Sequence, residues 1–191
     1  YLGGTHLPDI ALIMPIFADG RPIAFAATMT HHQDVGGMSP GSIPTNATEI
    51  YQEGLRLPPL KFRDGPDNFD QTVIKILRLN SRIPDTFMGD INAQVSSCTI
   101  GAQRVATLAG SHGGEMMLEL FAELLDRSAV MTRNALMKLP QGTYRYVDFN
   151  DNDGIDLDKR IRIEVAVTLR AGRFICDFTG SRSKNSMGKN L

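Results

Sequence analysis

The spacing of hydrophobic and polar positions changes twice along the chain and divides it into three regions. Residues 1–62 combine apolar runs with turn signals, which indicates strands and loops. Residues 70–139 repeat apolar positions at the spacing of amphipathic helices. Residues 143–180 alternate as strands do, and a glycine turn within them predicts a C-terminal antiparallel β-hairpin. The order of strands, helices and strands predicts an α+β fold.

The helical region is expected to contain one short and two long helices. The short helix is predicted over residues 70–79, and the first long helix over residues 84–109. The glycine-rich stretch 110–114 is expected to form a loop that contains His112. The second long helix is predicted over residues 115–138, and its apolar positions are assigned to the core.

A β-hairpin near the start of the chain would bring candidate metal ligands together. The apolar runs 9–18 and 22–30 flank an Asp-Gly pair, which is a strong signal for a hairpin turn. If the two strands pair, His6 and Asp9 at the start of the first lie near His31 at the end of the second. A hairpin places these two strand ends side by side.

Histidine and aspartate gather in this part of the sequence. His6 and Asp9 form one H-x-x-D pair, and His31 and Asp34 form another, with His32 inside it. Imidazole and carboxylate ligands suit Zn, Mn or Fe, and three protein ligands would leave an open position for a small-molecule substrate. Exposed polar residues at strand ends are the alternative interpretation, and spacing alone does not decide between the two.

Local geometry restricts how these residues could hold a metal ion. Residues three apart point to opposite faces of an extended strand, so His6 and Asp9 need a backbone turn, which Pro8 can supply. The adjacent His31 and His32 also face opposite ways, and we expect only one of them to reach a shared ion. His31 is the preferred ligand because it lies nearest the end of the hairpin.

Composition argues against several classes of partner. A net charge of -1 on 191 residues provides no field that would attract nucleic acid. No apolar run approaches the roughly 18 residues of a membrane span, and no signal peptide is visible. The isolated Cys98 and Cys176 favour a reducing cytoplasm over a disulfide framework. Because the chain starts with Tyr1 instead of Met, we expect a fragment of a longer protein.

Other patterns are weaker. Ser39 completes a G-x-S-x-G pattern, but the prolines after it prevent the helix that a nucleophile elbow requires. The acidic stretch 151–158 resembles a Ca²⁺ loop, but its glycine stands in the wrong register. Arg56, Lys61 and Arg63 could hold an anionic substrate, although surface positions are expected. The sequence has no phosphate-loop motif, so ATP chemistry would need a partner chain or domain.

Five motifs together resemble the hydantoinase B/oxoprolinase family. They are GGTHLPD (3–9), HHQDVGGMSPGS (31–42), IYQEGLRLPP (50–59), GDINAQ (89–94) and DFTG (177–180). The family contains the B subunit of N-methylhydantoinase, the C-terminal half of 5-oxoprolinase and the alpha subunit of acetone carboxylase. The resemblance implies that residues 1–191 form a single N-terminal to middle portion of a larger hydantoinase B-like domain.

The resemblance also implies ligands, a partner and a reaction. The metal ligands of the family motif correspond here to His6, Asp9 and His31. The implied partner is a hydantoinase A-like subunit or domain that binds ATP, so the protein would work in a hetero-oligomer and would not bind ATP itself. The implied reaction is ATP-coupled hydrolysis of a cyclic amide such as a hydantoin or 5-oxoproline.

The roles of the neighbouring residues and the reaction itself stay open at this point. His32 or Asp34 could act as a general base or orient other groups, and Glu53 could support the ligands from behind. A ketone carboxylase subunit is the main alternative, in which the metal would stabilise an enolate that attacks activated CO₂. A non-catalytic assembly scaffold is an alternative of another class.

Overall fold

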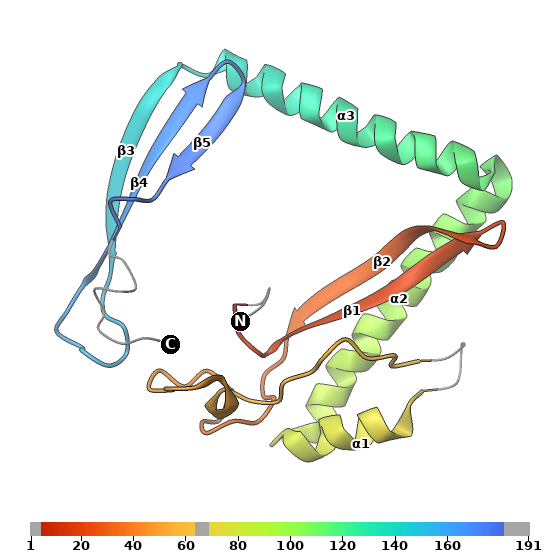
Figure 1. The fold of residues 1–191 in the computed structure, drawn as a ribbon, viewed down its shortest axis with the longest axis horizontal. Coiled ribbons are helices and arrows are strands. Elements are labelled where there is room, and N and C mark those ends of the chain that lie inside the picture. Colours follow the sequence, from red (N-terminus) through yellow and green to blue (C-terminus); the bar gives the residue numbers. More distant parts are fainter. Residues whose placement is uncertain (1–4, 64–68, 182–191) are drawn as a thin grey trace. The chain divides into compact units, whose positions relative to one another are not determined.

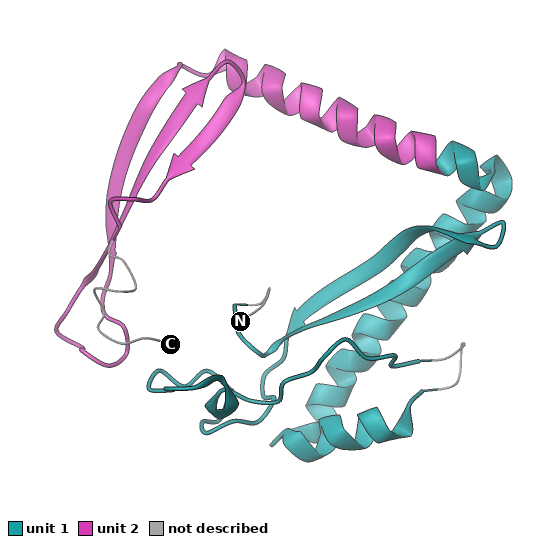
Figure 2. Cartoon of the chain, viewed as in Figure 1, with its two compact units in different colours: residues 1–117 teal, residues 118–191 magenta. Residues whose placement is uncertain are grey.

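The computed structural model describes residues 5–63 and 69–181 and confirms the α+β class. Within these residues there are two small antiparallel sheets and three α-helices (Figure 1). The chain divides into two compact units, residues 1–117 and 118–191, each of which contains one sheet (Figure 2). The two glycines that open the first family motif and the polar C-terminal residues 182–191 lie outside the described residues.

The first unit begins with the expected β-hairpin. Strands β1 (Asp9–Ala18) and β2 (Arg21–His31) pair in antiparallel fashion. Asp19 and Gly20 form the turn with positive φ angles of 51° and 74°, which are the values of a type I′ turn. The hairpin prediction is confirmed, and β2 is one residue longer at each end than the sequence pattern indicates.

A loop segment with the short 3-10 helix η1 (Ile50–Gln52) leads to helices α1 (Gln71–Asn80) and α2 (Pro84–His112). The Asp70 side chain caps α1 by accepting hydrogen bonds from two backbone N–H groups of its first turn. Pro84 occupies the first turn of α2, where its missing N–H costs nothing. No helix in the described part of the chain is sufficiently long and apolar to cross a membrane.

The break between the two long helices lies later than expected. Gly110 continues α2, and His112 is the last residue of that helix instead of a loop residue, so this prediction was wrong. Gly113 caps the helix directly after His112 and has a φ of 85°, a value that glycine adopts without the steric cost of a Cβ atom. A single glycine is tolerated inside a helix, which is why Gly110 does not end it.

The core of the first unit forms where the residues after β2 meet α1 and α2. A buried cluster contains residues from all three segments: Val35, Leu77, Phe87, Met88 and Ile91. The hairpin packs along α2. From Phe87 to Cys98 the buried positions of α2 lie one or three residues apart, which places them along one stripe of the helix.

The second unit contains most of α3 (Gly114–Lys138) and a three-stranded sheet. The sheet has the order β3-β4-β5, formed by β3 (Gly142–Asn150), β4 (Ile161–Arg170) and β5 (Arg173–Asp177). The predicted C-terminal hairpin corresponds to β4 and β5, and β3 adds a strand on the other edge of β4. Many apolar side chains of this unit are exposed, on the helix as well as on the sheet.

Candidate metal centre

The open end of the β1–β2 hairpin gathers the side chains that the sequence predicts as ligands. Asp9 and His31 are opposite one another in the strand register, and His6 precedes Asp9 by three residues. The backbone turns before β1, where the N–H of Ile10 donates to the carbonyl of Pro8 at 3.0 Å. This turn lets His6 and Asp9 converge, as expected from the position of Pro8.

The ligand atoms of these three residues lie close together. One atom each from His6, Asp9 and His31 lies within 4.8 Å of the other two. No other group of three His, Cys, Asp or Glu side chains among the described residues is arranged in this way. The rings of His6 and His31 meet edge to face, with 4.8 Å between their centroids.

The Nδ1 atom of His6 favours a bound cation at this point. Its Nδ1 atom lies 3.1 Å from Asp9 Oδ2 but has no hydrogen bond of acceptable geometry, although the atom is buried. An imidazole nitrogen and a carboxylate oxygen both offer lone pairs, so a divalent cation between them would satisfy both. His31 is exposed, whereas His6 and Asp9 are half-buried, so a bound ion would keep coordination positions that face solvent.

His32 lies on the opposite face of the chain from His31, as strand alternation predicts. It is completely buried, with its ring edge to face against Phe87 at 4.7 Å. His32 Nε2 lies 3.2 Å from Gln94 Oε1, and Nδ1 lies 3.9 Å from Asp90 Oδ2. Burial lowers the pKa of His32 despite the contacts with Gln94 and Asp90, which act in the opposite direction, so the ring is held neutral.

Asp34 anchors the glycine-rich loop that follows β2. Its buried carboxylate accepts hydrogen bonds from the backbone N–H groups of Gly36, Gly41 and Arg82, and it pairs with the Arg82 guanidinium at 2.9 Å. Burial by itself would raise the pKa of Asp34, but the hydrogen bonds from Arg82, Gly41 and Gly36 outweigh it and lower this pKa. A carboxylate with four donors suits an anchor better than a group that must accept a proton.

Arg82 is the residue of this region that the sequence pattern did not reveal. It lies between α1 and α2, and its guanidinium also donates to the carbonyl oxygens of Gly36, Gly37 and Ser39. These contacts join residues 43 to 46 positions apart in the sequence, and no local motif marks them. Several carbonyls of the loop therefore point at one side chain, which fixes the loop's path.

The other two candidates of this region lie in or beside the same loop. Ser39 lies in a turn with no helix after it, which agrees with the expectation that the following prolines prevent the helix of a nucleophile elbow. Glu53 follows η1 and is half-buried, and its supporting role stays a prediction. Gly37 packs against this segment, because a Cβ atom there would lie 2.6 Å from the Gln52 carbonyl oxygen and from the Glu53 carbonyl carbon.

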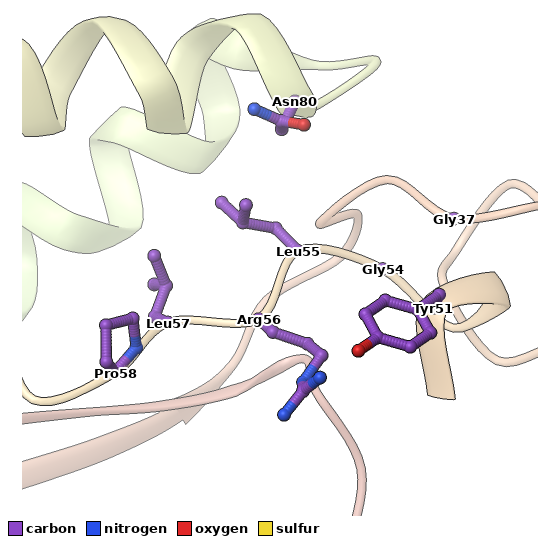
Figure 3. Close-up of a pocket in the computed structure, with 8 residues that line it drawn as sticks. All are labelled: Gly37, Tyr51, Gly54, Leu55, Arg56, Leu57, Pro58 and Asn80. Atoms are coloured by element: carbon purple, nitrogen blue, oxygen red, sulfur yellow. The ribbon is translucent and has the colours of Figure 1, made fainter. Parts of the chain in front are cut away.

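A pocket of about 560 Å³ opens beside the loop (Figure 3). Its lining consists of Gly37, Tyr51, residues 54–58 and Asn80. The Arg56 guanidinium lies over the Tyr51 ring, 5.1 Å from its centroid. Of the three basic residues proposed for anion binding, Arg56 is thus the one that lines this pocket, and none of the three metal-ligand candidates does.

The remaining candidates form no site in the described structure. In the acidic turn, Asn152 and Asp153 accept hydrogen bonds from backbone N–H groups two or three residues ahead, as in an ordinary turn. Cys98 is buried, Cys176 is exposed, and both are free thiols.

Comparison with known proteins identifies the family. The sequence pattern of the family described as hydantoinase B/oxoprolinase matches residues 1–191. The chain belongs to this family. Its members include cyclic-amide hydrolases of the hydantoinase, oxoprolinase and caprolactamase type, and carboxylases are related to them. The resemblance carried by the five sequence motifs is confirmed.

Individual relatives represent both reaction types. The chain is 35% identical over 186 residues to the B subunit of a putative D-/L-hydantoinase from Pseudomonas sp. (strain NS671), covering 95% of this chain and 31% of the relative. It is 28% identical over 153 residues to the acetophenone carboxylase delta subunit of Aromatoleum aromaticum, covering 80% of this chain and 22% of the relative. The crystal structure of ATP-dependent caprolactamase from Pseudomonas jessenii matches with a TM-score of 0.77 and 28% identity, over 91% of this chain and 30% of that one. The chain thus spans less than a third of the length of these relatives.

Proposed function

We propose that this protein is the metal-dependent subunit of an ATP-coupled cyclic amidohydrolase that acts on hydantoin- or 5-oxoproline-type substrates. The observation that carries the proposal is the convergence of His6, Asp9 and His31, whose ligand atoms lie within 4.8 Å of one another. The family to which the chain belongs supplies the reaction class. The ligand geometry by itself does not indicate a reaction, and the family by itself does not place a metal site in this chain.

His6, Asp9 and His31 would hold a divalent Mn, Zn or Fe ion in this proposal. Such an ion supplies Lewis-acid polarisation of a substrate carbonyl. The exposure of His31 supports access for a small molecule, because the ligand group opens to solvent on that side.

The neighbouring polar residues would orient the centre instead of exchanging protons with substrate. Asp34 and Arg82 hold the glycine-rich loop through the hydrogen bonds described above. His32 is completely buried and packs against Phe87, so it would position the strand end next to His31. Glu53 would support the same loop through the close contact of its backbone with Gly37.

ATP would be bound by a hydantoinase A-like partner in a cytoplasmic hetero-oligomer. Two observations support this assignment. The sequence contains no phosphate-loop motif. The hydantoinase and acetophenone carboxylase relatives are named as subunits.

Metal content of the purified protein tests the centre directly. Elemental mass spectrometry should find about one Mn, Zn or Fe ion per chain, and a His6→Ala/His31→Ala double variant should lose it. His112→Ala is the matched control, since it removes an exposed imidazole at the end of α2, and it should retain the metal. A wild-type protein without metal after reconstitution, or a double variant with undiminished metal, would contradict the proposal.

Product analysis separates hydrolysis from carboxylation. With the ATP-binding partner and ATP present, ring opening of a hydantoin or 5-oxoproline without bicarbonate supports the hydrolase. A strict requirement for bicarbonate supports a ketone carboxylase subunit, the second candidate, which is favoured by the similarity to the acetophenone carboxylase subunit. His6→Ala should abolish activity while assembly stays intact, and unchanged activity would favour the scaffold alternative.

A further inference from the structure

A buried glutamine of α2 connects β1 to the residue that follows β2, close to the candidate ligands. Gln94 is 3% exposed, and its amide faces the open end of the hairpin. Its Nε2 donates to the carbonyl oxygen of Ile10 in β1 at 2.9 Å, and its Oε1 lies 3.2 Å from His32 Nε2. One side chain thus bonds to residues 84 and 62 positions away in the sequence.

These two contacts flank the ligand pair. Ile10 directly follows Asp9, and His32 directly follows His31, while Asp9 and His31 are opposite one another in the register. The N–H of His32 also donates to the Pro8 carbonyl at 2.9 Å, which closes the ladder next to the ligands. Side chains of successive strand residues point to opposite faces. Gln94 therefore contacts the hairpin end on the face toward α2, and the candidate ligands point to the other face.

The orientation of the Gln94 amide follows from chemistry. A backbone carbonyl can only accept a hydrogen bond, so the amide NH₂ group must face Ile10 and the amide oxygen must face His32. His32 Nε2 must therefore carry the hydrogen that Gln94 Oε1 accepts. Glutamine at this position satisfies one acceptor and one donor at once, which neither glutamate nor methionine can do.

We propose that Gln94 is a positioning residue of the metal centre, which fixes the separation of Asp9 and His31 by bonding to the residue after each of them. This inference rests on the proposed metal-dependent function. Groups that orient metal ligands without touching the ion typically change metal affinity 10- to 100-fold when they are replaced, and we expect a loss of about this size here. Loss of the amide would also leave His32 Nε2 buried without this partner and would remove one hydrogen bond from the Ile10 carbonyl.

Zinc affinity of the full chain, measured with Zn²⁺ alone in competition with a chromogenic chelator, tests this role. Gln94→Met keeps the length of the side chain but removes both hydrogen bonds, and it should weaken Zn²⁺ binding about 10- to 100-fold. Gln103→Met makes the same chemical change on an exposed position of α2 and should bind as the wild type does. Gln94→Glu keeps an acceptor for His32 but has no donor for Ile10, so its Zn²⁺ affinity should lie between that of Gln94→Met and that of the wild type.

A buried control separates positioning from general destabilisation. Val95→Ala removes core volume from the adjacent position of α2 but leaves both Gln94 hydrogen bonds in place, so its Zn²⁺ affinity should stay near that of the wild type. Wild-type affinity in Gln94→Met, or an equal loss in Val95→Ala, would overturn the positioning role while leaving the metal centre intact. A wild-type chain that binds no Zn²⁺ would overturn the metal centre itself and this inference with it.

Discussion

The two units of this chain form secondary structure equally well but differ in what they bury. In residues 1–117, the Phe87 side chain is 2% exposed and packs in a cluster shared by α1, α2 and the loop after β2. In residues 118–191, Phe174 of β5 is 57% exposed, and apolar residues of α3 and β3 are exposed as well. Hydrogen-bonded strands and helices therefore do not by themselves make a core, because a core needs a second layer against the apolar face.

The same contrast applies to the candidate chemistry. Every residue of the candidate metal centre and of its supporting contacts belongs to the unit with the packed core. Ligands placed on a rigid, packed support keep their separation without the help of the ion, which strengthens binding. The comparison predicts that equal changes in the two units have unequal consequences, and matched substitutions can test this.

The largest difference is expected for two phenylalanine deletions. Phe87→Ala should lower the free energy of unfolding by about 3–5 kcal/mol, since it removes a buried ring and leaves a cavity. Phe174→Ala should change it by roughly 0.5 kcal/mol or less, because that ring already contacts solvent. Urea denaturation followed by circular dichroism measures both. A large loss in Phe174→Ala would show that the second unit has a core in solution, and the comparison would fail.

A second pair compares glycines with positive φ in each unit. Gly37 has a φ of 83°, and an added Cβ would lie 2.6 Å from backbone atoms of Gln52 and Glu53, so Gly37→Ala should cost about 2–4 kcal/mol. Gly172 has a φ of 73°, but its closest contacts, on Arg133, lie at 3.3 Å, so Gly172→Ala should cost roughly 1 kcal/mol. Equal losses in the two variants would indicate that backbone strain, and not the close approach at Gly37, dominates.

The hairpin and the cluster of candidate ligands could be predicted from the sequence because hairpin topology is local. An Asp-Gly turn sets the register, and the register places Asp9 opposite His31. Arg82 and Gln94 could not be assigned their roles in this way, since their partners lie more than 40 residues away in the sequence. Alternation in β4 likewise predicted an apolar face but could not indicate whether any layer covers it.

A third pair compares two carboxylates that pair with arginine. Asp34→Asn should cost about 1–3 kcal/mol, because the buried carboxylate accepts from Arg82 and from loop N–H groups. Glu164→Gln should cost about 1 kcal/mol or less, since its partners Arg145 and Arg162 are largely exposed. Denaturation gives both values, and limited proteolysis should detect loosening of the loop 36–42 only in Asp34→Asn. Cleavage that is no faster than in the wild type would argue against the anchor.

The smallest effect is expected from acid, because protonation of Asp34 neutralises the carboxylate but keeps its shape and part of its capacity to accept hydrogen bonds. The folded-state pKa of Asp34 lies below the ordinary value of 3.8, so the unfolded chain binds the proton more readily. The stabilisation by Asp34 is therefore complete above about pH 5 and is lost as the pH falls through 4 toward the folded-state pKa. Denaturation midpoints of the wild type should fall more steeply below about pH 5 than those of Asp34→Asn, in which this titration is absent. Parallel pH profiles would mean that the charge of Asp34 contributes nothing to the first unit, and the two units would then differ in their apolar packing alone.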